Sequence, residues 1–118
     1  MATDKEGVGL VFYRRGAQAG TLEADWVLNR PASGFFKKGL ATGGPKTGYA
    51  GSYLVTYFDD KGEPCNPYDL QIQSYGDVFH LSWSRGGETQ YEGVGSLSHN
   101  MLVAGWGPVP GKSYPEEK

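Results

Sequence analysis

Hydrophobic and polar residues alternate along most of this chain, and no stretch shows the 3.6-residue spacing of an amphipathic helix. In segment 21–29, for example, apolar residues occupy positions 22, 24, 26 and 28, whereas Glu23 and Asp25 stand between them. Successive side chains of a β-strand point to opposite faces, so this segment predicts a half-buried strand. We expect Trp26 on its inner face and the two carboxylates on its outer, solvated face.

Turn-forming residues divide the alternating stretches into about eight predicted strands. Glycine, proline, asparagine and aspartate recur at short intervals, and Gly86-Gly87 is a typical hairpin turn. The predicted strands are 7–15, 21–29, 35–41, 49–58, 68–73, 78–85, 89–97 and 101–106. The connections are too short for crossover helices, so consecutive strands are expected to pair as an antiparallel meander.

A meander of this length favours closure into a barrel. Closure removes both exposed edges, and eight strands enclose either packed side chains or one small ligand. The sequence therefore predicts an all-β fold, a single antiparallel up-and-down β-barrel of about eight strands. A two-sheet sandwich is the alternative. The 118 residues suit one domain, with the barrel expected over 1–107 and a flexible, proline-rich and charged tail over 108–118.

Charge and cysteine content narrow the class of partner and the compartment. The net charge is −2 and the longest basic runs are pairs, so no basic stripe predicts nucleic-acid binding. No apolar stretch approaches the roughly 20 residues that cross a membrane as a helix, and the first residues lack the apolar core of a secretory signal. Cys65 is the only cysteine, so no intrachain disulfide can form and a cytoplasmic location is expected.

Aromatic residues of inward parity are the strongest candidates for function. Glycines of the same parity, such as Gly93 and Gly95, remove side-chain volume from the barrel wall and favour a cavity. Tyrosine hydroxyls would supply the few polar groups that orient a ligand in an apolar pocket. The predicted ligand-binding residues are Trp26, Tyr53, Tyr57, Tyr68, Trp83, Tyr91 and Trp106. The alternative interpretation is that these rings only fill a packed core.

The second half of the chain resembles a known superfamily. Its aromatic and glycine spacing runs through Gly51-x-Tyr53, Phe79-x-Leu81-x-Trp83, Tyr91-x-Gly93 and Leu102-x-Ala104-x-Trp106. This order resembles the calycin barrels, which include lipocalins, fatty-acid-binding proteins and avidins, over about residues 50–106. The resemblance implies an up-and-down barrel with a ligand inside. The first strand lacks the Gly-x-Trp of lipocalins, and no avidin-like Asn and Ser set is identifiable, so biotin is not implied.

Three functions follow from these patterns. The first is binding of a small hydrophobic or aromatic ligand inside the barrel. The second is an isomerase or cyclase that uses a tyrosine, or inward-pointing Glu23 and Asp25, as acid or base. The third is a solidly packed barrel that acts as an interaction module. We expect no cofactor and no metal, because His80 has outward parity and neither histidine has ligand-like spacing to a partner.

Three further features of the sequence carry expectations. Leu10 and Phe12 in the first strand, and Leu54 and Phe58 in the fourth, are apolar residues of outward parity. They favour a homodimer, with burial under the tail or a long loop as the alternative. Segment 42–48 is predicted to be a mobile loop and a candidate lid over one barrel mouth. Cys65, in a turn without a histidine partner, is expected to be an unreactive thiol.

Overall fold

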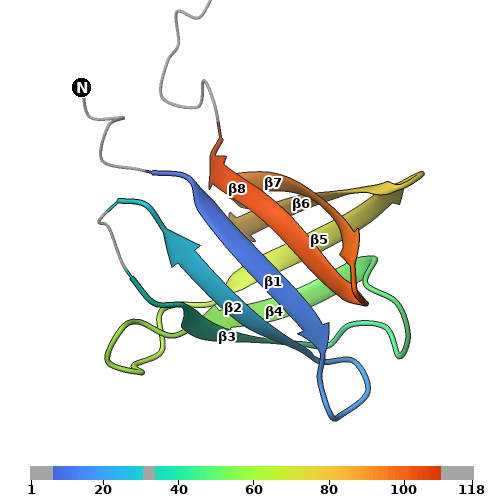
Figure 1. Cartoon of the computed structure of the whole chain (residues 1–118), viewed down its shortest axis with the longest axis horizontal. Helices are drawn as coiled ribbons and strands as arrows, with labels where there is room; N and C mark the ends of the chain where they lie inside the picture. Colours follow the sequence, from blue (N-terminus) through green and yellow to red (C-terminus); the bar gives the residue numbers. More distant parts are fainter. Residues whose placement is uncertain (1–6, 31–33, 110–118) are drawn as a thin grey trace, which may run out of the picture.

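The chain forms a closed barrel of antiparallel strands (Figure 1). The computed structural model describes residues 7–30 and 34–109. The strands are β1 (Gly9–Arg15), β2 (Leu22–Leu28), β3 (Lys37–Thr42), β4 (Gly51–Tyr57), β5 (Tyr68–Tyr75), β6 (Val78–Arg85), β7 (Glu88–Ser98) and β8 (Met101–Pro108). The predicted all-β, eight-stranded up-and-down barrel is thus confirmed, and the sandwich alternative is wrong.

Closure takes place between the first and last strands, which lie side by side in Figure 1. Gly9 of β1 is the register partner of Trp106 of β8, and Tyr13 is the partner of Leu102. All other neighbours are consecutive in sequence, so every strand is paired on both sides. The barrel therefore has no free strand edge, which removes the usual template for aggregation.

One end of the barrel is closed by the segment between β3 and β4. Arg15 holds this segment by donating to three of its backbone carbonyls, those of Pro45, Lys46 and Gly48. Tyr49 extends the closure by donating to the carbonyl of Asn100, 2.8 Å away in the β7–β8 turn. The segment that the sequence marked as a candidate lid is therefore a plug, fixed to its surroundings at this end.

The core fills the closed half of the barrel, and alternation explains its composition. Inward positions of seven of the eight strands carry apolar side chains with almost no exposure, and β7 contributes none of them. The buried set is Val11, Tyr13, Leu22, Ala24, Ala41, Tyr49, Tyr53, Val55, Leu70, Ile72, Leu81, Trp83, Leu102 and Ala104. Within the described ranges, this core contains no buried charged residue.

The outward face of β2 holds the two carboxylates, as alternation predicts. Asp25 accepts a hydrogen bond of 2.6 Å from Arg14 and one of 2.7 Å from Lys38. Partial burial would raise the pKa of Asp25, but these two cationic donors outweigh it and leave the pKa below its ordinary value. Glu23 is exposed beside Arg14. The inverted parity that would have made these groups an internal acid–base pair is therefore wrong.

The C-terminal boundary of the barrel differs slightly from the expectation. β8 continues to Pro108, one residue beyond the predicted end of the domain. Val109 still donates a backbone hydrogen bond to Gln90, at 3.3 Å. The remainder of the predicted flexible tail, 110–118, lies outside the described residues. Within the described ranges, no helix is long and apolar enough to cross a membrane.

Candidate ligand-binding site

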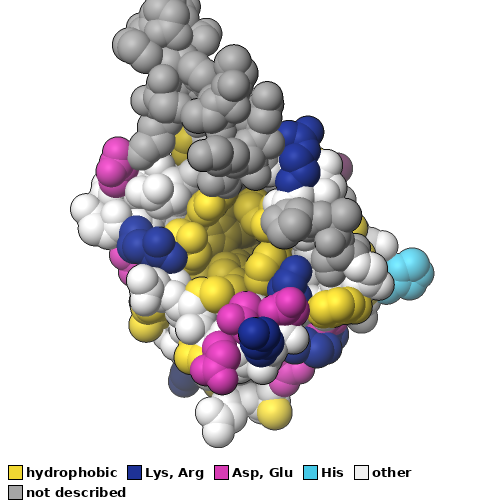
Figure 2. All heavy atoms as spheres, turned by 90° about the vertical axis from the view of Figure 1, so that its left-hand side faces the viewer, with side chains coloured by type: hydrophobic (Ala, Val, Ile, Leu, Met, Phe, Trp, Pro, Cys, Tyr) yellow, Lys and Arg dark blue, Asp and Glu magenta, His cyan; other side chains and the backbone are white. Residues whose placement is uncertain are grey.

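A cavity opens at the end of the barrel opposite the plug. Its volume is about 150 Å³. Figure 2 shows this end as a hollow with hydrophobic walls, surrounded by basic and acidic side chains. The lining residues come from β2, β4, β5, β6, β7, β8 and the β4–β5 connection; they are Trp26, Leu28, Tyr57, Cys65, Tyr68, Trp83, Tyr91 and Trp106. None of these lining residues is an Asp, Glu, Lys, Arg or His.

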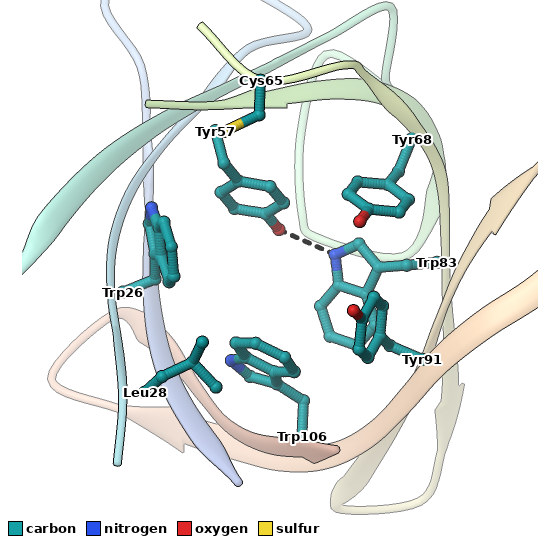
Figure 3. Close-up of a pocket in the computed structure, with 8 residues that line it drawn as sticks. All are labelled: Trp26, Leu28, Tyr57, Cys65, Tyr68, Trp83, Tyr91 and Trp106. Carbon is teal, nitrogen blue, oxygen red and sulfur yellow. Dashed lines mark hydrogen bonds between the residues drawn. The ribbon is translucent and has the colours of Figure 1, made fainter. Parts of the chain in front are cut away.

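Five aromatic rings surround the cavity in an unbroken sequence of contacts, which we call the aromatic circuit. Its members are Trp26, Tyr57, Tyr68, Tyr91 and Trp106 (Figure 3). Centroids of adjacent rings are 5.4 to 6.4 Å apart. Three of the five contacts are edge-to-face, the arrangement that aromatic quadrupoles favour. Each ring is thus held by two others, which gives the cavity a preformed wall.

A hydrogen-bonded group forms the floor of the cavity. Trp83 donates its indole N–H to the hydroxyl of Tyr57 at 2.7 Å, the dashed line in Figure 3. The hydroxyl of Tyr57 also bonds to that of Tyr13, which lies deeper in the barrel. Burial raises the pKa of both tyrosines above the ordinary value, and for Tyr13 the adjacent Tyr57 hydroxyl adds to the shift. Both therefore stay protonated at neutral pH and fix the indole of Trp83.

Two inward-facing glycines make room for the rings. A Cβ atom at Gly9 would lie 2.2 Å from the indole of Trp106, its register partner. A Cβ atom at Gly39 would lie 2.7 Å from the ring of Tyr57, again its register partner. The space left by each missing side chain is therefore taken by an aromatic ring. Gly93 is as crowded, because its Cβ would lie 2.4 Å from the carbonyl oxygen of Gly105.

A β-bulge re-aims the strand that carries Tyr91. Trp83 pairs with Tyr91, but the next residue, Ser84, pairs with Thr89, so Gln90 is the extra residue in β7. Bulges bend a strand and are common beside functional sites because they redirect side chains. Here the bulge lies next to the register pair of Trp83 and Tyr91, two of the lining residues.

Six of the seven residues predicted from the sequence line this cavity together. The exception is Tyr53, which is buried at the closed end, where its hydroxyl donates to the carbonyl of Tyr49 at 2.8 Å. Its ring occupies the space beside Gly44. Tyr53 has the predicted inward direction, but it lies too deep in the barrel to reach the cavity.

The sequence-based list omits two lining residues. Leu28 has the same inward parity as Trp26, and this parity could have identified it as a lining residue. Cys65 lies in the irregular β4–β5 connection, where alternation gives no direction. It is a free, exposed thiol, and its backbone N–H donates to the carbonyl of Tyr57 at 2.8 Å. This bond holds the connection against the cavity wall.

The other candidate residues lie away from the cavity. His80 is on the outer wall, with its ring 4.6 Å from that of Tyr75. His99 and Asn100 form the exposed β7–β8 turn with positive φ angles of 54° and 65°. Among the described residues, no group of three or more His, Cys, Asp or Glu side chains could hold a metal ion.

Comparison with protein-family models, with curated proteins and with solved structures gives no match for this chain. The fold and the site therefore stand on the geometry of the barrel itself.

Proposed function

We propose that this protein binds a small, largely apolar molecule of about one aromatic ring in the open half of its barrel. The observation that supports the proposal most is the aromatic circuit, which surrounds about 150 Å³ with a wall of preformed rings. An apolar cavity of about this size in another protein takes up benzene. Pockets for drug-sized ligands start at about 300 Å³, so a larger ligand does not fit without rearrangement.

The test uses the chain's own tryptophans. All three, Trp26, Trp83 and Trp106, line the cavity, so their fluorescence reports on its occupancy. We expect toluene to shift and saturate this fluorescence, and calorimetry to give the same dissociation constant. Pyrene, a four-ring molecule, should have no effect. The absence of any response to single-ring compounds by either method would refute the proposal.

A matched pair of variants locates the binding. Leu28→Phe adds volume inside the cavity and should weaken toluene binding at least tenfold. Leu54→Phe adds the same atoms on the outer wall, where Leu54 is 50% exposed, and should leave binding unchanged. An equal effect of both variants would show that toluene binds elsewhere.

The proposal extends to kinship, location and assembly. The strand order and closure are compatible with a calycin-like barrel, and this supports kinship with that superfamily. The single exposed thiol supports a cytoplasmic location.

Leu10 and Leu54 are exposed on the outer wall, whereas Phe12 packs edge-on against Phe36 and Phe58 is partly buried. We expect the chain to form a homodimer through its exposed outer leucines. Sedimentation should detect the dimer, and Leu54→Asp should abolish it.

A further inference from the structure

The mouth of the cavity carries two cations that lie on rings of the aromatic circuit. Lys37 is the register partner of Trp26, so both side chains are on the inner face, and the Lys37 Nζ atom is 4.7 Å from the Trp26 ring centroid. The Arg85 Cζ atom is 3.9 Å from the ring centroid of Tyr68. Each of these two rings therefore carries a cation at the point where the apolar interior meets solvent.

The two cations differ in what else they contact. Arg85 is anchored, because its guanidinium donates to the carbonyls of Asn66 and Pro67 at 3.0 and 3.3 Å. Lys37 has no hydrogen-bond acceptor and no ion-pair partner within residues 7–30 and 34–109. The next residue shows the contrast, since Lys38 on the outer wall pairs with Asp25 at 2.7 Å. The charge of Lys37 is therefore available to a ligand at the mouth.

Two polar groups of the cavity wall, the indole N–H of Trp106 and the hydroxyl of Tyr68, are available as well. No described residue accepts a hydrogen bond from the indole N–H of Trp106, and none bonds to the hydroxyl of Tyr68. Figure 3 shows the hydroxyl group of Tyr68 directed toward the enclosed space, whereas the hydroxyl of Tyr57 is already bonded to Trp83 and Tyr13. An indole N–H can only donate, and a hydroxyl can donate or accept. The lining contains no carboxylate. This set of groups suits a ligand that brings acceptors and negative charge.

We propose that the ligand is an aromatic acid, with its ring inside the aromatic circuit and its carboxylate at the mouth beside Lys37. This inference rests on the proposed function and adds the charge of the ligand to it. The competing ligand for a cage of aromatic rings is a quaternary ammonium. Two resident cations already lie on ring faces at this rim, so a third positive charge on the same rings would meet repulsion.

Three ligands of nearly equal shape test the proposal: phenylacetate, phenylacetamide and protonated 2-phenylethylamine. Affinities are measured at pH 7 by tryptophan fluorescence and calorimetry on the full chain. We expect phenylacetate to bind tightest and the cation weakest. The Lys37→Met variant should weaken phenylacetate about fivefold, the upper range for an exposed ion pair, and leave phenylacetamide unchanged. The control Lys38→Met, on the outer wall, should change neither.

The outcomes separate the inference from the proposed function. If phenylacetamide binds as tightly as phenylacetate, or Lys37→Met weakens both equally, the cavity binds rings without regard to charge and the inference is wrong. If the ammonium compound binds tightest, the inference is also wrong and the circuit is a cation cage. In both cases the proposed function stands. If none of the three compounds binds and toluene does not bind, both proposals fail.

Discussion

At the scale of single residues, Tyr57 connects the core to the cavity. Its ring belongs to the aromatic circuit, and its hydroxyl lies in the interior, where it bonds to Trp83 and Tyr13. Because the indole of Trp83 can only donate, the Tyr57 oxygen is the group that satisfies it. One hydroxyl group therefore holds two deeper side chains in place beneath the cavity.

Removal of this hydroxyl should be costly. In Tyr57→Phe, the Trp83 N–H and the fully buried Tyr13 hydroxyl lose their partner. Leaving buried polar groups unsatisfied costs about 1–3 kcal/mol, so the free energy of unfolding in urea should fall by about that amount. The control is Tyr75→Phe, since Tyr75 is 56% exposed on the outer wall. Equal, small losses in both variants would contradict the assigned role of Tyr57.

At this scale the sequence predicts directions better than depths. Alternation correctly gives the inward parity of Tyr53 and Tyr57, because parity is a local property of a strand. It does not give their depth along the barrel axis, which depends on the stagger of neighbouring strands. Tyr53 was therefore grouped with the cavity residues although it packs against the plug. Cys65 has no strand parity, so no local pattern could have placed it.

At the scale of strands, the shape of the cavity depends on pairs of residues in neighbouring strands. Gly9 lies beneath Trp106 and Gly39 beneath Tyr57, and each pair joins two strands through its register. Turn residues predicted the strand ends to within two residues, but they could not predict these pairs, because the sequence of a single strand does not specify its register with a neighbour. The sequence suggested that glycines open the cavity. The structure shows instead that Gly93 and Gly95 are crowded by backbone carbonyls of β8, and that Gly9 and Gly39 give space to the rings of the wall.

Gly9→Ala tests this arrangement. The new Cβ would lie 2.2 Å from the Trp106 indole, so the ring must shift out of its position on β1. We expect a loss of about 1–3 kcal/mol of stability, as for overpacking elsewhere, together with altered tryptophan fluorescence. Gly34→Ala is the control, because a Cβ there meets nothing within 4 Å. If Gly9→Ala changes neither stability nor fluorescence, the Trp106 indole does not lie against Gly9.

The plug at the closed end depends on one side chain of β1. Arg15→Ala removes the donors to the carbonyls of Pro45, Lys46 and Gly48. The segment should then open more often, and trypsin should cleave after Lys46 faster than in the unmodified protein. Arg14→Ala is the matched control, because Arg14 pairs with Asp25 on the outer wall. Equal cleavage rates in the two variants would show that Arg15 does not hold the plug.

At the scale of the whole molecule, the fold was predictable because its signals are redundant. Alternation, turn residues and short connections all indicate a meander, and closure follows from the need to pair both edges.

The buried tyrosine hydroxyls also make the free energy of unfolding of the whole barrel depend on pH. Tyr13 and Tyr57 have pKa values raised by burial, so they keep their protons in the folded state at a pH where the unfolded chain loses them.

The sign of this dependence is fixed by linkage. Unfolded tyrosine ionises near pH 10, so below about pH 9 the two groups contribute their full stabilisation. As the pH rises further, the unfolded chain holds fewer protons than the barrel and the free energy of unfolding falls. Urea unfolding between pH 7 and 11 should show this decrease, and Tyr57→Phe should reduce its slope. A flat profile to pH 11 would contradict the burial of these hydroxyls.

The closing contact between β1 and β8 has a consequence for how the protein folds. Seven strand pairs join neighbours in sequence and can form as hairpins, whereas Gly9 must meet Trp106, 97 residues away (106 − 9). Pairing at such separation is entropically the most demanding and is expected to come last. Trp106 is also part of the aromatic circuit, so the cavity has no complete wall before this seam forms. A nascent or partly folded chain therefore has no binding competence, and the appearance of that competence during refolding marks the moment of barrel closure.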